Sequence, residues 1–161
     1  MGLFFYFSIG NEIRLMYNNH KDRKVITMNY NMNKLGNITV KYPVDCGNAP
    51  KKLLLKDFHV AVVQNDRDFI SDNLTDDTLW KIVGDKEIEG KEKVTSTLLN
   101  SYQNVSKLEI EQIITHGKIT SINGTVTYQH DKKLAFCHVH IFNNASKTAK
   151  IKESTSYLIN I

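Results

Sequence analysis

Three changes of hydrophobic period follow one another within residues 66–94, and this succession restricts the folds open to the chain more than any other feature. Asp66 suits the N-cap of a short helix, because its carboxylate accepts backbone N–H groups of the first turn. Residues 79–89 combine apolar, β-branched positions with a tight turn at Gly84, which is typical of a β-hairpin. Gly90 precedes a second amphipathic segment. The stretch therefore predicts a short helix, a hairpin and the start of a new helix.

The segments on either side have one clear period each. Residues 51–64 repeat apolar side chains at helical spacing, after Pro50 in a position that suits the first turn of a helix. A second amphipathic helix is expected over residues 91–103. From residue 107 onward the period changes to two, and short polar turns separate segments of about ten residues. We expect four long antiparallel strands, over residues 107–116, 119–129, 134–143 and 149–161.

The first part of the chain lacks such periods. Residues 1–34 are Asn-rich in their second half, and we expect a loosely ordered N-terminal extension there, with Met28 or Met32 as an alternative start of the native protein. The apolar residues 1–9 lack a basic flank and are too short for a membrane span. The predicted domain therefore comprises residues 35–161, and no membrane partner is expected.

Charge and cysteine usage exclude some classes of function. The net charge is only +4, and Arg, the usual reader of bases, occurs at three positions, 14, 23 and 67. A nucleic-acid partner is therefore not expected. The two cysteines, Cys46 and Cys137, form neither a disulfide framework nor a metal-type spacing. Free thiols in a reducing compartment are the simplest reading, which predicts a cytoplasmic protein.

The order of elements resembles one known superfamily. Together with the pattern Asp76-Asp77-x-x-Trp80-x-Ile82-x-Gly84 followed by Ile88-x-Gly90-Lys91-Glu92-x-Val94, it resembles the nuclear transport factor 2-like superfamily, in its SnoaL-like branch. The resemblance covers residues 51–161 and concerns turns and apolar positions. It implies an α+β fold, the cystatin or nuclear transport factor 2-like cone, in which N-terminal helices pack on a strongly bent antiparallel sheet. It also implies an apolar pocket inside the cone and a homodimer through the sheet.

Enzymes of this superfamily provide tests at single residues. The resemblance places the catalytic Asp of ketosteroid isomerases at Ile82, their oxyanion-hole Tyr at Phe58 and their protonated Asp at His138. Isoleucine carries no proton and a phenyl ring donates no hydrogen bond, so that mechanism is not expected. Members resembling limonene-epoxide hydrolase need an Arg in the pocket, and Arg67 falls between the first two helices instead.

The same resemblance directs a set of side chains into the cone. His138 and His140, two positions apart on one strand face, lie roughly 6 to 7 Å apart and are the candidate catalytic residues, with His138 as general acid/base. Gln112 and Tyr128 are expected to orient a ligand. The full predicted ligand-binding set is Phe58, Val62, Trp80, Ile82, Tyr102, Gln112, His116, Tyr128, Phe136 and Phe142. On the last strand Ser154, Ser156 and Leu158 are expected to face inward.

A metal site is the sharper alternative and is not favoured. His116, His138 and His140 are ligand types that zinc accepts, but no loop-borne pair of ligands accompanies them. We therefore expect neither a metal nor another cofactor.

Three functions remain open. The domain binds a small, largely apolar ligand without turnover, or it performs proton transfer as an isomerase, cyclase or dehydratase through His138 and His140. The third option is a purely structural dimerisation module whose pocket is filled by aromatic side chains. The apolar outward row of Ala135, Cys137, Val139 and Ile141 supports the expected homodimer.

Overall fold

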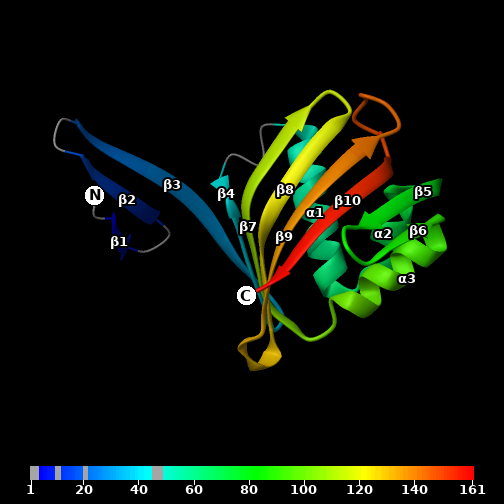
Figure 1. Cartoon of the computed structure of the whole chain (residues 1–161), viewed down its shortest axis with the longest axis horizontal. Coiled ribbons are helices and arrows are strands. Elements are labelled where there is room, and N and C mark those ends of the chain that lie inside the picture. Colours follow the sequence, from blue (N-terminus) through cyan, green and yellow to red (C-terminus); the bar gives the residue numbers. More distant parts are fainter. Residues whose placement is uncertain (1–3, 10–11, 20–21, 45–48) are drawn as a thin grey trace.

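In a computed structural model of the chain, residues 4–9, 12–19, 22–44 and 49–161 are described. Three helices lie on one side of a single ten-stranded sheet (Figure 1). The helices are α1 (Pro50–Gln64), α2 (Arg67–Asp72) and α3 (Lys91–Ser101). The strands are β1 (Phe4–Ile9), β2 (Glu12–Asn19), β3 (Asp22–Leu35), β4 (Ile38–Pro43), β5 (Leu74–Ile82), β6 (Lys86–Glu89), β7 (Val105–His116), β8 (Ile119–Tyr128), β9 (Lys133–Phe142) and β10 (Ile151–Asn160). The predicted α+β fold with a bent sheet is confirmed.

The sheet is antiparallel except at two places. Its order is β1-β2-β3-β4-β7-β8-β9-β10-β5-β6. The pairs β4–β7 and β10–β5 are parallel, because long connections that contain the helices separate their strands in sequence. As a result the early hairpin of β5 and β6 joins the sheet beside β10. The curled sheet and the helices enclose the space in which the core lies (Figure 1).

The predicted hairpin between two helices is present. Asp66 caps α2 through a hydrogen bond from the Phe69 backbone N–H to Oδ1, 3.0 Å long. One boundary differs: β5 begins at Leu74, within a polar stretch before the hairpin that is expected from residue 79. Leu74 is buried and pairs with Ile151 of β10, so tertiary pairing extends the strand where the local composition opposes it.

The N-terminal segment contains strands. The sequence alone places a loosely ordered extension at residues 1–34, and β1, β2 and most of β3 fall within that span. β3 pairs with β4 through Tyr30 to Leu35 and so continues the sheet beyond the helices (Figure 1). Residues 1–3, 10–11 and 20–21 of the extension, and Cys46, lie outside the described residues. The division of the chain after residue 34 stays a prediction.

Within the described ranges, no helix is both long and apolar enough to cross a membrane.

Candidate functional site

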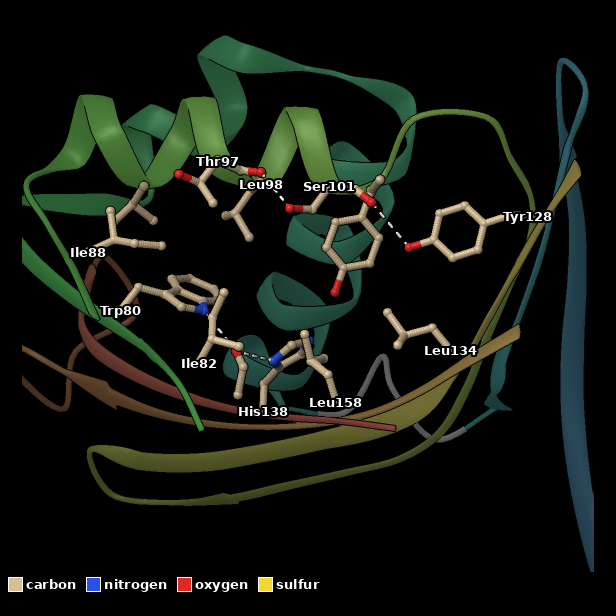
Figure 2. A pocket seen from close by; sticks show the side chains of 13 residues that line it. Trp80, Ile82, Ile88, Thr97, Leu98, Ser101, Tyr128, Leu134, His138 and Leu158 are labelled. Atoms are coloured by element: carbon tan, nitrogen blue, oxygen red, sulfur yellow. Dashed lines mark hydrogen bonds between the residues drawn. The ribbon is translucent and has the colours of Figure 1, made fainter. Parts of the chain in front are cut away.

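A partly enclosed cavity lies between α3, the β5–β6 hairpin and the ends of β8, β9 and β10 (Figure 2). We call it the outer cavity. Its enclosed volume is about 50 Å³, and the volume with its open mouth is about 420 Å³. Its lining is mostly aliphatic and aromatic, and the residues are Trp80, Ile82, Ile88, Val94, Thr97, Leu98, Ser101, Tyr102, Tyr128, Leu134, His138, Ser156 and Leu158. An apolar wall with a few polar groups is the usual anatomy of a small-molecule site.

A second space, the inner cavity, adjoins it toward α1. Its enclosed volume is about 10 Å³, and the volume with its open side is about 300 Å³. Trp80, Leu98, Tyr102 and His138 line both cavities, and α1 adds Phe58 and His59 to the inner one. His138 and Trp80 therefore stand where the two spaces meet.

A short chain of hydrogen bonds holds His138. The Trp80 indole N–H donates to Oγ of Ser156 over 2.7 Å, and the same oxygen lies 2.7 Å from Nδ1 of His138. Figure 2 shows this chain beneath the outer cavity. The strands place these groups together because Ser156 pairs with His138 between β10 and β9, and Trp80 pairs with Ser154 between β5 and β10.

His140 repeats the arrangement one step along β9 but without a cavity. Its Nδ1 lies 2.6 Å from Oγ of Ser154, and the residue is fully buried. Its Nε2 has no hydrogen-bond partner within the part of the chain that the structure describes. Neither cavity is lined by His140. The residue belongs to the core between Phe58 and Trp80, which contact its ring edge to face at centroid distances of 6.5 and 5.6 Å.

A third imidazole, on α1, completes a buried cluster. His59 lies with its ring centroid 5.2 Å from that of His138 and 5.8 Å from that of His140. Its Nδ1 is 2.9 Å from the carbonyl oxygen of Leu55, and because a carbonyl only accepts, this nitrogen carries the proton. The predicted ligand-binding set does not include His59, which lines the inner cavity.

Burial keeps the three imidazoles neutral. It lowers the pKa of His59 to about 4, against the smaller opposing effect of the hydrogen bond to Leu55. It also lowers the pKa of His138 and His140 well below the ordinary value, and the neighbouring imidazoles act in the same direction. Near pH 7 the cluster therefore offers hydrogen-bonding groups without net charge.

Most of the predicted ligand-binding residues line the cavities. Trp80, Ile82, Tyr102 and Tyr128 line the outer one, and Phe58, Val62 and Phe136 line the inner one. Phe142 faces inward as expected but is buried beneath the Lys51 ammonium, which lies 4.9 Å from its ring centroid. The inward face of β9 and the inward positions Ser154 and Ser156 of β10 are confirmed.

The prediction is wrong for Gln112 and His116, which are exposed. Strict alternation puts them on the face of Leu108 and Ile110. However, the register shifts between Ile110 and Gln112, so one extra residue enters β7 and every later side chain changes face. Ile113 is buried in their place.

The structure does not bring a set of metal ligands together. Among the described residues, no group of three or more His, Cys, Asp or Glu side chains is arranged to hold a metal ion. The alternative with His116, His138 and His140 fails because His116 is exposed on β7 while the other two are buried on β9.

Several lining residues are missing from the predicted ligand-binding set, although Ser156 and Leu158 are expected to face inward. Ile88, Leu98, Leu134 and Leu158 contribute the aliphatic part of the wall, and Ser156 contributes the hydroxyl that holds His138. The alternation of β10 predicts that Ser156 faces inward. Its pairing with His138 depends on strand register, for which the local sequence carries no signal.

Comparisons with solved structures find this fold in proteins of low sequence identity. An NTF2-like protein of unknown function from Burkholderia xenovorans has a TM-score of 0.61 at 16% identity, over 70% of this chain and 84% of that chain. A protein provisionally assigned as a ketosteroid isomerase, from Kribbella flavida, has a TM-score of 0.58 at 10% identity, over 70% and 79%. One provisionally assigned as a SnoaL-like polyketide cyclase, from Shewanella denitrificans, has a TM-score of 0.56 at 13% identity, over 68% and 90%. No family model and no curated protein matches the sequence.

These similarities identify the fold as the NTF2-like α+β cone. They do not identify an activity, because one fold supports many functions and the similar structures include a protein of unknown function.

Proposed function

We propose that this NTF2-like domain binds a small, uncharged, largely apolar molecule in the outer cavity. The observation that carries the proposal is the lining itself. No Asp, Glu, Lys or Arg is among the described residues that line either cavity, and the polar lining groups of the outer one are hydroxyls and one neutral imidazole. A charged ligand entering such a site would lose hydration without gaining a counter-charge.

The dimensions support a small ligand. Only about 50 Å³ of the cavity is enclosed, so the ligand is small and extends from the enclosed part into the open mouth. Trp80 and Tyr102 offer flat apolar surface to a ring of such a ligand.

A pair of substitutions on adjacent positions of β10 tests the proposal. Leu158 lines the outer cavity, whereas its neighbour Ile159 is 63% exposed. Binding of 1-indanone, a neutral bicyclic probe, is followed by chemical-shift changes of the wild-type protein. Leu158→Trp fills the cavity and should abolish these changes, while Ile159→Trp adds the same bulk outside and should preserve them. Equal binding by both variants would place the probe elsewhere and contradict the proposal.

Proton transfer is the second candidate, and the position of His138 favours it. His138 lines both cavities, so its imidazole is within reach of a bound molecule, where an imidazole N–H can donate to the carbonyl oxygen while solvent water takes the C2 proton. His140 lines neither, so we assign it no contact with substrate. The test is exchange of the C2 protons of 1-indanone in D₂O, measured by NMR with the wild type and His138→Gln. Enhanced exchange that disappears in the variant supports catalysis; equal rates would restrict the domain to binding.

We also propose that a second copy of the chain covers the convex face of the sheet. Ile114, Ile119 and Ile141 are 61%, 54% and 36% exposed there, and Ile119 pairs directly with Ile141. The helices lie on the opposite side, so no element of the described chain covers this apolar group (Figure 1). A homodimer mass in sedimentation at micromolar concentration, lost in Ile119→Lys, is the expected result. A monomeric wild type would overturn the proposal.

A reducing, cytoplasmic location is proposed on the thiol chemistry. Cys137 is free and half-buried on the convex face, where its Sγ lies 3.8 Å from Oγ of Ser121. We expect both cysteines to react with a thiol reagent in freshly isolated, unfolded protein. Recovery of a disulfide-linked form from its own cells would contradict this.

A further inference from the structure

The hydrogen-bond chain beneath the outer cavity fixes which nitrogen of His138 carries the proton. An indole N–H only donates, so Oγ of Ser156 accepts from Trp80. The single hydrogen of this hydroxyl is free to be donated, and within the described chain the hydrogen-bond acceptor beside it is Nδ1 of His138. Ser156 therefore donates to Nδ1. The proton of the neutral imidazole resides on Nε2.

This nitrogen is available to a ligand. His138 lines both cavities, and Nε2 has no hydrogen-bond partner within the described part of the chain. The cavity wall therefore presents an N–H donor at the point where the two spaces meet.

The other hydroxyl hydrogens around the outer cavity are mostly engaged within the protein. The Tyr128 hydroxyl donates to the carbonyl of Ser101 over 3.1 Å. The Ser101 hydroxyl donates to the carbonyl of Thr97, and the Thr97 hydroxyl to that of Lys93, each over 2.8 Å. Figure 2 shows the first two of these contacts above the cavity. Tyr102, which lines both cavities, is the remaining hydroxyl, and burial raises its pKa, so it stays protonated.

We infer that the ligand is a neutral molecule that carries a hydrogen-bond acceptor, held by Nε2–H of His138 and the hydroxyl of Tyr102. Ser156 is then a positioning residue that determines specificity, because it selects the tautomer that donates. This inference rests on the proposed binding function and adds the chemical class of the ligand to it.

The chain supplies its own matched control. Ser154 contacts Nδ1 of His140 over 2.6 Å just as Ser156 contacts His138, on the same two strands and in the same register. His140 lines neither cavity. Removal of the Ser154 hydroxyl therefore disturbs an equivalent pair without changing what a ligand meets.

The first experiment needs no ligand. Long-range ¹H–¹⁵N NMR of the imidazoles should show His138 in the Nε2–H form in the wild type, and a shift toward a mixture of tautomers in Ser156→Ala. Trp80→Phe keeps a ring in place but frees the hydroxyl from its donor, and it provides a second route to the same mixture if Ser156→Ala fails to fold. Observation of the Nδ1–H form in the wild type would overturn the inference.

The second experiment compares three probes of nearly equal shape by titration calorimetry. 1-Indanone offers an acceptor, indole offers a donor, and indane offers neither. We expect 1-indanone to bind about three- to tenfold more tightly than indane, the range for one neutral hydrogen bond, and indole to gain nothing. The preference should decrease in Ser156→Ala, in which only part of the imidazole is in the donating form, and stay unchanged in Ser154→Ala. Equal affinities in the wild type would overturn the inference alone, whereas binding of no probe would overturn the proposed function as well.

Discussion

Gly124 of β8 faces the backbone carbonyl oxygen of Glu109 on β7 so closely that no Cβ fits between them. The contact lies next to the register shift at which β7 gains its extra residue. We expect Gly124→Ala to lower the free energy of unfolding by roughly 3 kcal/mol or more, because backbone rather than a flexible side chain must move. Gly117→Ala is the control: its positive φ of 58° faces open space, and it should cost about 1 kcal/mol. Urea denaturation compares them, and equal losses would contradict the role of the contact.

The buried imidazoles make stability depend on pH. The pKa of His59 is about 4 in the folded protein, and those of His138 and His140 are well below the ordinary value. In the unfolded chain each of these histidines has a pKa of about 6.5. Between the folded-state and unfolded-state pKa values the unfolded chain binds more protons than the folded protein. The stability that comes from keeping the three imidazoles neutral is therefore complete above about pH 6.5 and is lost as the pH falls.

We expect the free energy of unfolding to fall by about 1.4 kcal/mol per pH unit for each such histidine below about pH 6. His59→Gln should reduce the slope between pH 6 and 5 by about that amount. His116→Gln changes an exposed histidine and serves as the control. Urea denaturation across this range measures the slopes, and identical slopes in the wild type and His59→Gln would contradict a neutral buried cluster.

Lys51 joins α1 to two loops at one end of the sheet. Its ammonium donates to the carbonyls of Gly117 and Asn144, over 2.5 and 3.3 Å, and so joins α1 to the β7–β8 turn and to the loop after β9. Lys51→Met keeps the apolar stem but leaves two carbonyls without their donor, and we expect a loss of about 1 to 3 kcal/mol. Lys147→Met, at an exposed position of the same loop, should change stability by less than about 0.5 kcal/mol. Thermal and chemical denaturation decide between these values.

We expect that His140 and Ser154 can be replaced together without loss of stability. His140→Leu removes an imidazole whose Nε2 is buried without a partner, but it leaves the Ser154 hydroxyl without its hydrogen-bond partner. We expect the single variant to be less stable than the double variant with Ser154→Ala by about 1 kcal/mol, and the double variant to equal the wild type at pH 7. A double variant that is far less stable than either single variant would contradict this.

The sequence predicts the helices and strands of this fold better than it predicts which strands pair and in which register. Alternation along β9 places His138 and His140 on the inner face because no bulge interrupts that strand. The same reasoning fails for Gln112 and His116, because an extra residue in β7 moves every later side chain of that strand to the opposite face of the sheet. Asn123 and Gly124 do signal an irregularity in the sequence, but the extra residue lies on the partner strand, where no local feature marks it.

The candidate site likewise has one part that the sequence predicts and one part that it does not. The apolar wall contributed by Trp80, Tyr102 and Phe136 follows from periodicity and from the resemblance to the cone. The contact of Ser156 with both Trp80 and His138 depends on the register of three strands, two of which are parallel neighbours. Local sequence contains little information on such long-range pairing.

The position of β10 between β9 and β5 also has a consequence for biosynthesis. Trp80 and Ser156 are 76 positions apart, so the ribosome releases the hairpin long before the strand that will hold it. Until β10 emerges, the indole N–H lacks its acceptor, His138 lacks its donor, and the edge of β5 that later pairs with β10 is uncovered. A nascent chain therefore passes through a stage in which this sheet edge is open to pairing with other chains, and the outer cavity forms only when β10 pairs with β5.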